Sequence, residues 1–316
     1  MRGAGLALAL PLLLSAQETP HPNRVAWAAI FPEPLPEGVS ALALEATSQF
    51  LRPDRRASLD GRTTARLDGE EWQLTGDWAL PLGPGRFNVR IRVVDRSGGF
   101  ADQAFYSYHQ VLGLPQGGRE LAPKNLLDYH LERDGVVIAD LRRPGVHLMD
   151  TDVSYVVEKG TRREGLRLGA SLQLPTGKRE DFSGSGGIDA LLGVAGWTTV
   201  DLIRFFGQME QVWIGLPKDS PYRAVLATQA FKRVWVGAAY QGQGPGILRG
   251  LGLEVSLGYN QNPYHVAIAR LDVAGWMQHW TVTHKALPRW RFGLSEEAGT
   301  FHAPDITAFV TYRFGA

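Results

Sequence analysis

The sequence predicts an all-β fold, a single antiparallel transmembrane β-barrel of about 12–14 strands with one short amphipathic helix in a loop. Three observations support it. Segments of alternating apolar and polar residues recur along the chain, aromatic residues lie near the ends of these segments, and the N-terminus resembles an export signal. A strand directs successive side chains to opposite faces, so alternation indicates two different surroundings. In an outer-membrane barrel the apolar row faces lipid and the polar row faces the lumen.

The N-terminus has the order of charge, apolar core and small residues that is typical of a secretory signal peptide. Arg2 precedes an apolar core at Leu6–Leu14, and the small pair Ser15–Ala16 follows it. No later run approaches the length of about 18 apolar residues that a membrane helix needs. An exported protein without a membrane helix is either a soluble periplasmic or secreted protein or an outer-membrane barrel of a Gram-negative type envelope. We predict a signal peptide at residues 1–16, a Pro-rich N-terminal segment at 17–38 and a barrel at 39–316, with a helical loop insertion at about 97–126.

The composition limits the possible partners and sites. The 33 basic and 32 acidic residues leave a formal net charge of +1, which gives no electrostatic basis for binding nucleic acid. The 37 glycines and 9 tryptophans suit many turns and interfacial aromatic residues. The sequence has no cysteine, which excludes disulfides and any Cys-based metal or nucleophile site.

Strand-like alternation covers most of the chain. Arg62–Pro81 is predicted to form a hairpin that turns at Asp68–Gly69. The apolar rows expected to face lipid include Leu166, Leu168, Leu172, Leu253, Val255 and Leu257. Other strands are predicted at Leu42–Phe50, Arg86–Asp95, Asp152–Glu158, Gly165–Pro175, Ile188–Trp197, Leu202–Trp213, Arg223–Phe231, Arg233–Gln241, Gly250–Asn260, His265–Val273, Trp276–His284 and Arg289–Glu297.

One segment has the spacing of a helix. Its apolar residues are Phe100, Ala104, Phe105, Tyr108, Val111 and Leu112. Gly113 and Pro115 follow as stop signals. A helix of about 13 residues is roughly 20 Å long, too short to cross a bilayer. We therefore expect an amphipathic helix that packs on the sheet or in a barrel mouth.

Aromatic residues near the strand ends indicate that the outer surface of the sheet faces lipid and not water. The predicted girdle contains Trp72, Trp78, Trp197, Trp213, Trp235, Tyr259, Tyr264, Trp276, Trp290 and Tyr312. A soluble β-sandwich explains charges on the polar rows equally well, but it does not need so many aromatic residues at strand ends. In a barrel, the lumen-facing candidates are Arg90, Arg92, Arg167, Glu254, Arg291 and Arg313.

The last strand, Ile306–Phe314, lies almost at the C-terminus. Its apolar row is Ile306, Ala308, Val310, Tyr312 and Phe314, and its alternate row contains Thr307, Thr311 and Arg313. A barrel must pair its last strand with its first, because an open edge in hydrocarbon leaves backbone groups without partners. We therefore predict that this strand closes the barrel.

Three stretches resemble a family of bacterial outer-membrane proteins. They are "SYHQVLGLPQGGRE" (Ser107–Glu120), "LQLPTGKREDFSGSGGID" (Leu172–Asp189) and the closing "RWRFGLSEEAGTFHAPDITAFVTYRF". Together they resemble the domain-of-unknown-function family three-one-eight-seven, with similarity from about Phe31 to Phe314. The resemblance implies an outer-membrane barrel, and it assigns no catalytic residues.

An enzymatic function has little support in the sequence. Ser256 and His279 are candidates for a shared polar row, but no Gly-x-Ser-x-Gly motif is present. No His-Glu-x-x-His motif is present either, and His279 and His284 are an odd number of residues apart, so one strand cannot direct both toward a metal. We predict no catalytic residues, no metal site and no cofactor.

The leading hypothesis is a non-enzymatic barrel for passive transport of small solutes. The second is an outer-membrane protein with a structural or binding role and a closed lumen. The third is a barrel hydrolase that acts on lipid. The expected partners are outer-membrane lipid, the barrel assembly machinery and a small solute, without nucleic acid.

Overall fold

The structure is a computed structural model, and it shows a closed antiparallel barrel of 12 strands. It describes residues 39–51, 62–100, 102–113, 123–161, 163–226, 228–243, 249–261, 275–297 and 306–315. The predicted signal peptide, the Pro-rich segment, most of the predicted strand His265–Val273 and Tyr264 lie outside these residues. The predicted fold class is confirmed, and the strand number is at the lower end of the expected range.

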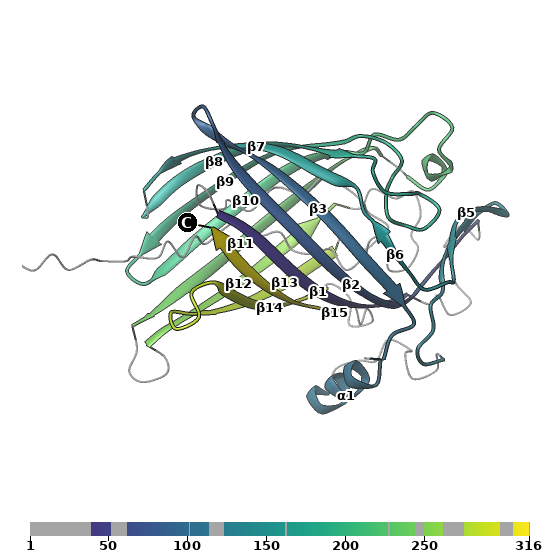
Figure 1. Cartoon of the computed structure of the whole chain (residues 1–316), viewed down its shortest axis with the longest axis horizontal. Helices are drawn as coiled ribbons and strands as arrows, with labels where there is room; N and C mark the ends of the chain where they lie inside the picture. The colour runs from purple at the N-terminus through teal and green to yellow at the C-terminus, as the bar shows by residue number, and fades with distance from the viewer. Residues whose placement is uncertain are drawn as a thin grey trace, which may run out of the picture.

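The barrel strands follow one another around the sheet in chain order, interrupted only by the long segment between β3 and β7 (Figure 1). They are β1 (Val39–Leu51), β2 (Thr63–Leu82), β3 (Gly85–Ser97), β7 (Thr151–Gly160), β8 (Glu164–Leu174), β9 (Asp189–Val200), β10 (Ile203–Trp213), β11 (Ala230–Gln243), β12 (Arg249–Asn260), β13 (Gly275–His284), β14 (Trp290–Glu297) and β15 (Ile306–Gly315). Outside the barrel lie α1 (Asp102–Leu112), β4 (Tyr129–Arg133), β5 (Val136–Leu141), β6 (Gly145–Leu148) and the short 3-10 helix η2 (Pro221–Ala224).

The last strand closes the barrel on the first. β15 pairs antiparallel with β1 in continuous register from Val39 opposite Gly315 to Ser48 opposite Ile306 (Figure 1). On β15, Thr307 and Thr311 are buried, while Val310 and Tyr312 are partly exposed. This agrees with the predicted assignment of the two rows. The side chains of Ile306 and Phe314 are not among those described.

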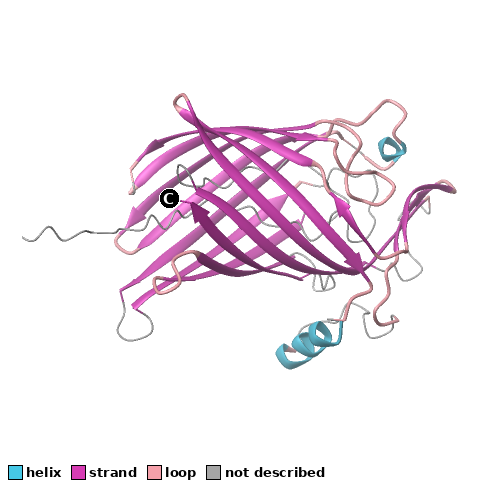
Figure 2. Cartoon of the chain, in the orientation of Figure 1, coloured by secondary structure: helices cyan, strands magenta, loops and turns pink. Residues whose placement is uncertain are grey.

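The two ends of the barrel differ in the length of their connections. At one end, two residues join β2 to β3 and two join β9 to β10, and Gly83 adopts φ +57°, a conformation that suits glycine in a tight hairpin. The other end carries the long segments 98–150, 175–188 and 214–229 (Figure 2). Because barrels of this class have short periplasmic turns and longer outer loops, the long-loop end faces outward.

Two strand predictions are wrong. The chain does not turn at Asp68–Gly69, because β2 runs straight through these residues and turns only after Leu82. The N–H groups of Asp68 and Asp128 each donate to the other's carbonyl oxygen, which extends β2 beyond the barrel toward the β4–β5 hairpin. The predicted strand Arg223–Phe231 is also wrong, because η2 lies at its start and β11 begins at Ala230.

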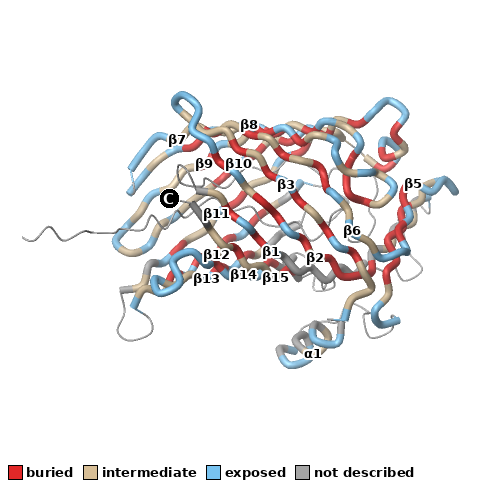
Figure 3. Tube along the Cα trace, viewed as in Figure 1, coloured by how far each residue is buried: buried red, intermediate tan, exposed pale blue. Residues whose placement is uncertain are grey.

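The outer surface carries the apolar rows. Leu166, Leu168 and Leu172 on β8 are about half exposed, while the alternate residues Arg167 and Ser171 are buried. Figure 3 shows the same alternation of buried and exposed residues along neighbouring strands. A solvent-exposed band of large apolar side chains around a closed barrel is stable in lipid and unfavourable in water. This surface places the protein in the outer membrane.

Aromatic residues mark both edges of the band. Trp78, Trp290 and Tyr312 lie near the short-turn end, and Trp290 contacts Tyr312 with ring centroids 4.9 Å apart. Trp72 and Trp213 lie toward the long-loop end. The girdle assignment is wrong for two residues, because Trp197 and Trp235 lie on the inner row of the barrel. Trp235 is also buried. The Trp276 side chain is not among those described.

A charge placed in the middle of the outer band should destabilise the barrel strongly. Leu168→Arg is expected to lower the free energy of unfolding in vesicles by about 2–4 kcal/mol, because the guanidinium would lie near the bilayer midplane. The matched control is Val137→Arg on β5, since Val137 and Leu168 are both 53% exposed but Val137 lies in a loop hairpin outside the barrel. Its expected effect is within about 0.5 kcal/mol. Equal losses, measured by denaturant titration, would contradict the lipid-facing assignment.

Candidate functional site

The inner wall of the barrel is polar and charged. The structure places Arg90, Arg92, Arg167, Glu254 and Arg291 in the buried row that alternates with the apolar outer row, and Arg313 is partly exposed. Within the described residues, each of the first five has a carboxylate or guanidinium partner on the same wall.

A ladder of ion pairs crosses β2, β3 and β7. Arg90 binds Asp77 with both forks of its guanidinium, Nε at 2.6 Å and Nη2 at 2.8 Å from the two carboxylate oxygens. One step toward the long-loop end, Arg92 Nη2 donates to Asp152 Oδ2 at 2.7 Å and to the Asp150 carbonyl oxygen at 3.0 Å. Bidentate and charge-assisted bonds of this kind fix side-chain geometry.

The ladder continues around the wall. Arg167 on β8 donates to Glu158 on β7, with Nη2 3.0 Å from Oε2. Across the barrel, Arg233 and Glu210 pair at 2.6 Å between β11 and β10. The alternation predicts Arg90 and Arg167, but the acidic partners and the Arg233–Glu210 pair depend on the strand register, which the sequence alone does not supply.

Charges on this wall are therefore balanced locally. Arg291 also lies 3.6 Å from Glu254, although β13 separates their strands. An inner surface built from such pairs presents N–H donors and carboxylate acceptors side by side, with little net charge. It differs from a ring of like charges, which selects ions of the opposite sign.

Aromatic rings on the inner row lie flat against glycines of the next strand. A Cβ added at Gly237 would lie 2.3 Å from Phe206, and one added at Gly293 would lie 2.1 Å from Phe309. Trp235 covers Gly258 in the same way. The missing side chains let each ring lie along the wall instead of projecting toward the barrel axis.

Arg96 connects the inner wall to the loop between β8 and β9. Its side chain is fully buried, and Nε donates to Glu71 Oε1 at 2.6 Å. The other guanidinium nitrogens donate to the carbonyl oxygens of Asp181 and Phe182, the latter at 2.9 Å. His147 Nδ1 also contacts Asp181 Oδ2 at 2.8 Å. These contacts hold the 175–188 loop at the barrel mouth.

Asp150 anchors the same loop from a second point. Its two carboxylate oxygens accept N–H groups of Gly177 at 2.8 Å and Ser185 at 3.0 Å. Burial raises the pKa of the Asp150 carboxyl above its usual range, while the two N–H donors oppose that shift. Asp150 thus holds the loop at Gly177 and Ser185, and Arg96 holds its middle at Asp181 and Phe182.

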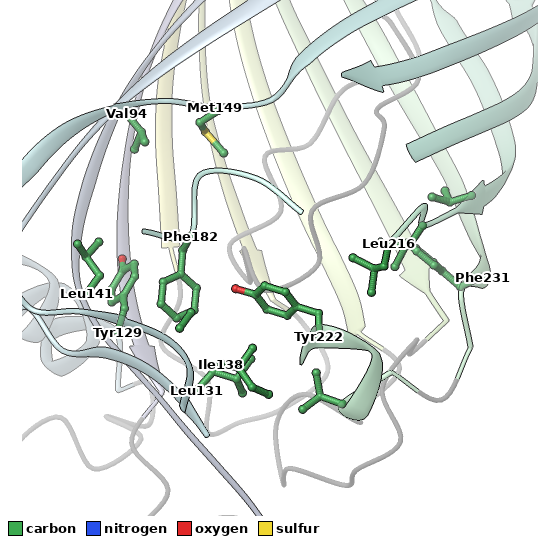
Figure 4. Packing of buried hydrophobic residues seen from close by; sticks show 14 of the residues in the cluster. Val94, Tyr129, Leu131, Ile138, Leu141, Met149, Phe182, Leu216, Tyr222 and Phe231 are labelled. Carbon is green, nitrogen blue, oxygen red and sulfur yellow. The ribbon is translucent and has the colours of Figure 1, made fainter. Parts of the chain in front are cut away.

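The outer loops meet in an apolar core at the mouth (Figure 4). Phe182 of the 175–188 loop contacts Tyr129 of β4 edge to face, with ring centroids 5.8 Å apart. Tyr222 of the 214–229 loop is buried, and its hydroxyl donates to the Arg179 carbonyl oxygen at 3.2 Å. The core also contains Leu131, Ile138, Leu141, Met149, Leu216 and Phe231. The long loops thus pack onto one another at the outer mouth.

Ser256 and His279 are brought together, as the sequence allowed. They are register partners on β12 and β13, and both are buried. His279 Nε2 lies 2.9 Å from Thr281 Oγ1, and the ring stacks on Phe309 at 5.0 Å. Within the described residues, Ser256 Oγ and His279 Nδ1 have no hydrogen-bond partner. An activated serine requires a hydrogen-bonded base, and the described contacts show no such bond between these two side chains.

Solved structures of outer-membrane barrels resemble this fold. The COG4313 outer membrane channel from Pseudomonas putida F1 aligns with a TM-score of 0.54 at 11% identity, covering 89% of this chain and 97% of that one. The KdgM porin aligns with a TM-score of 0.42 at 9% identity, covering 87% and 99%. The P. putida toluene transporter TodX aligns with a TM-score of 0.41 at 10% identity, covering 89% and 91%.

Sequence comparison identifies the family. No curated protein matches the chain. A family model described as "Protein of unknown function (DUF3187)" matches residues 41–213, which confirms the predicted resemblance over that part of the chain. These residues include the ion-pair ladder of β2, β3, β7 and β8 and the loop that Arg96 holds. The chain belongs to the DUF3187 family.

Proposed function

We propose that the protein is a non-enzymatic channel of the outer membrane that lets small polar solutes pass by diffusion. One observation carries the proposal: a closed barrel with an apolar outer surface carries a polar inner wall of paired charges from β2 around to β14. A polar interior is typical of barrels that conduct water and solutes. The Pseudomonas putida structure with the same barrel fold is a channel, which is in line with the proposal.

The pairing of charges bears on which solutes pass. Arg90, Arg92, Arg167, Glu254 and Arg291 are proposed to contact the solute through hydrogen bonds rather than through net charge. Since each cation lies beside a carboxylate, neither sign of ion is favoured along the whole wall. Small uncharged polar molecules fit such a surface best. Arg313, near the short-turn end of β15, is proposed to contribute to the same lining.

A closed lumen is the second candidate, and two observations favour it. Most inner-row side chains are buried, and the outer loops pack into a core at the mouth. A barrel closed in this way would have a structural or binding role. Outer-membrane lipid and the barrel assembly machinery remain proposed partners under either function.

Conductance of the refolded protein distinguishes the two candidates. In planar bilayers, the channel proposal predicts discrete steps of small conductance with weak preference between potassium and chloride. Liposomes containing the protein should swell in isotonic solutions of a small sugar such as arabinose, and swelling should slow for larger sugars. Folded protein, verified by heat-modifiable migration on gels, that gives neither steps nor swelling would overturn the channel proposal and support the closed barrel.

A further inference from the structure

The helix α1 lies outside the barrel wall at the long-loop end, where the chain leaves β3 (Figures 1 and 2). Gly99 turns the chain out of β3 toward it with φ +70°, and a Cβ there would lie 1.9 Å from the Glu70 side chain. Among the described side chains, Gln103 contacts Lys124, which belongs to the same long segment. In the view of Figures 1 and 2 the helix lies to one side of the barrel and not over its mouth.

Phe100 connects this segment to the lipid-facing band. Its ring stacks on Trp72 of β2, with centroids 6.1 Å apart and an interplanar angle of 19°. Trp72 shares the outer row with Leu74, which is 45% exposed. The apolar surface of the barrel therefore continues through Trp72 to Phe100, in the segment that leads to α1.

Two apolar side chains of the helix are described, those of Ala104 and Val111, and both are exposed, Val111 to 84%. Phe100, just before the helix, is 75% exposed. In the sequence of α1, Ala104, Phe105, Tyr108, Val111 and Leu112 recur at helical spacing, whereas Gln103 and Gln110 lie on the opposite side. Helices shorter than about 12–15 residues are marginal in water, so an 11-residue helix needs an apolar surface to stabilise it.

We infer that α1 is an interfacial helix that docks its apolar side into the outer leaflet of the membrane beside the barrel. The apolar side of α1 would contact lipid at the boundary between headgroups and acyl chains. Amphipathic helices lie at this boundary with their apolar face inserted by about 5–10 Å. Trp72 and Phe100 set the depth, because large aromatic rings are favoured at that level. The sequence of α1 contains no Lys or Arg, so the attraction is apolar and should persist at high salt.

Single-cysteine labelling tests the inference, since the natural chain has no cysteine. Val111→Cys and Gln110→Cys carry a polarity-sensitive nitrobenzoxadiazole label in full-length protein refolded into phosphatidylcholine vesicles. Both native residues are exposed, and they lie about 100° apart around the helix axis, Val111 within the apolar side and Gln110 outside it. The label at position 111 should emit at shorter wavelength and be quenched by lipids with a doxyl group near the headgroup. The label at position 110 should instead be quenched by iodide present on both sides of the membrane.

Phe100→Ala provides the second measurement. In the Val111→Cys background it should reduce doxyl quenching and increase iodide quenching, while the heat-modifiable folded band remains. Equal accessibility of positions 110 and 111 to iodide would overturn the inference, as would doxyl quenching at position 111 that Phe100→Ala leaves unchanged. These outcomes do not depend on whether the barrel conducts solutes.

Discussion

Removal of Ile306–Ala316 is expected to abolish the folded barrel. The deletion takes away β15, which pairs with β14 on one side and β1 on the other. The two exposed edges would leave rows of N–H and C=O groups in hydrocarbon, at a cost of several kcal/mol per group. Refolding in detergent and lipid should therefore give no heat-modifiable band on gels.

Removal of Gly315–Ala316 is the matched control. In the register of β1 and β15, Gly315 opposite Val39 is the final pair, so this shorter deletion removes the end of the ladder and leaves the rest in place. The folded band should persist. Insertion of the longer deletion as a folded barrel would show that β15 does not close the sheet, and the case for a membrane barrel would lose its main support.

The outer rows could be predicted from the sequence because their alternation is strict. On β8, every outer position from Leu166 to Leu172 is apolar and Arg167 marks the inner row. On β9 both rows after Asp189 consist of apolar or small residues apart from Trp197 itself, so the period of two does not distinguish the faces, and Trp197 was assigned to the wrong one. The same ambiguity affects Trp235 on β11, where valines and alanines surround it.

The contacts that build the mouth could not be predicted, because they join residues far apart in the chain. Arg96 follows the alternating run of β3, yet its partners Glu71, Asp181 and Phe182 come from β2 and from a loop about 85 positions later. The Gly/Ser-rich composition of residues 184–187 indicated a loop, but it did not indicate that this loop packs at the barrel mouth. The turn assigned to Asp68–Gly69 failed for a similar reason, since Asp128 pairs with this part of β2.

Replacement of Arg96 by Met is expected to destabilise the protein and loosen its outer mouth. Met has a similar length, so the change removes the charge and the hydrogen bonds while it fills most of the same space. Glu71, which is 1% exposed, would lose its buried cation, and breaking a buried pair in this way costs about 3–5 kcal/mol. The 175–188 loop would also lose the bonds to Asp181 and Phe182. We expect a lower free energy of unfolding in denaturant and a larger single-channel conductance.

Arg62→Met is the control for this prediction. Arg62 pairs with Asp134 at 2.7 Å, almost the same distance as in the Arg96–Glu71 pair, but its side chain is 58% exposed. Exposed pairs contribute about 0–1 kcal/mol, so stability should change little, and the conductance should not change. Equal losses of stability in the two variants would show that burial of the Arg96 pair has no special effect. If Arg96→Met lowers the stability but leaves the conductance unchanged, the 175–188 loop that Arg96 holds does not limit the passage of ions. The contacts of Arg96 would then have a structural role only.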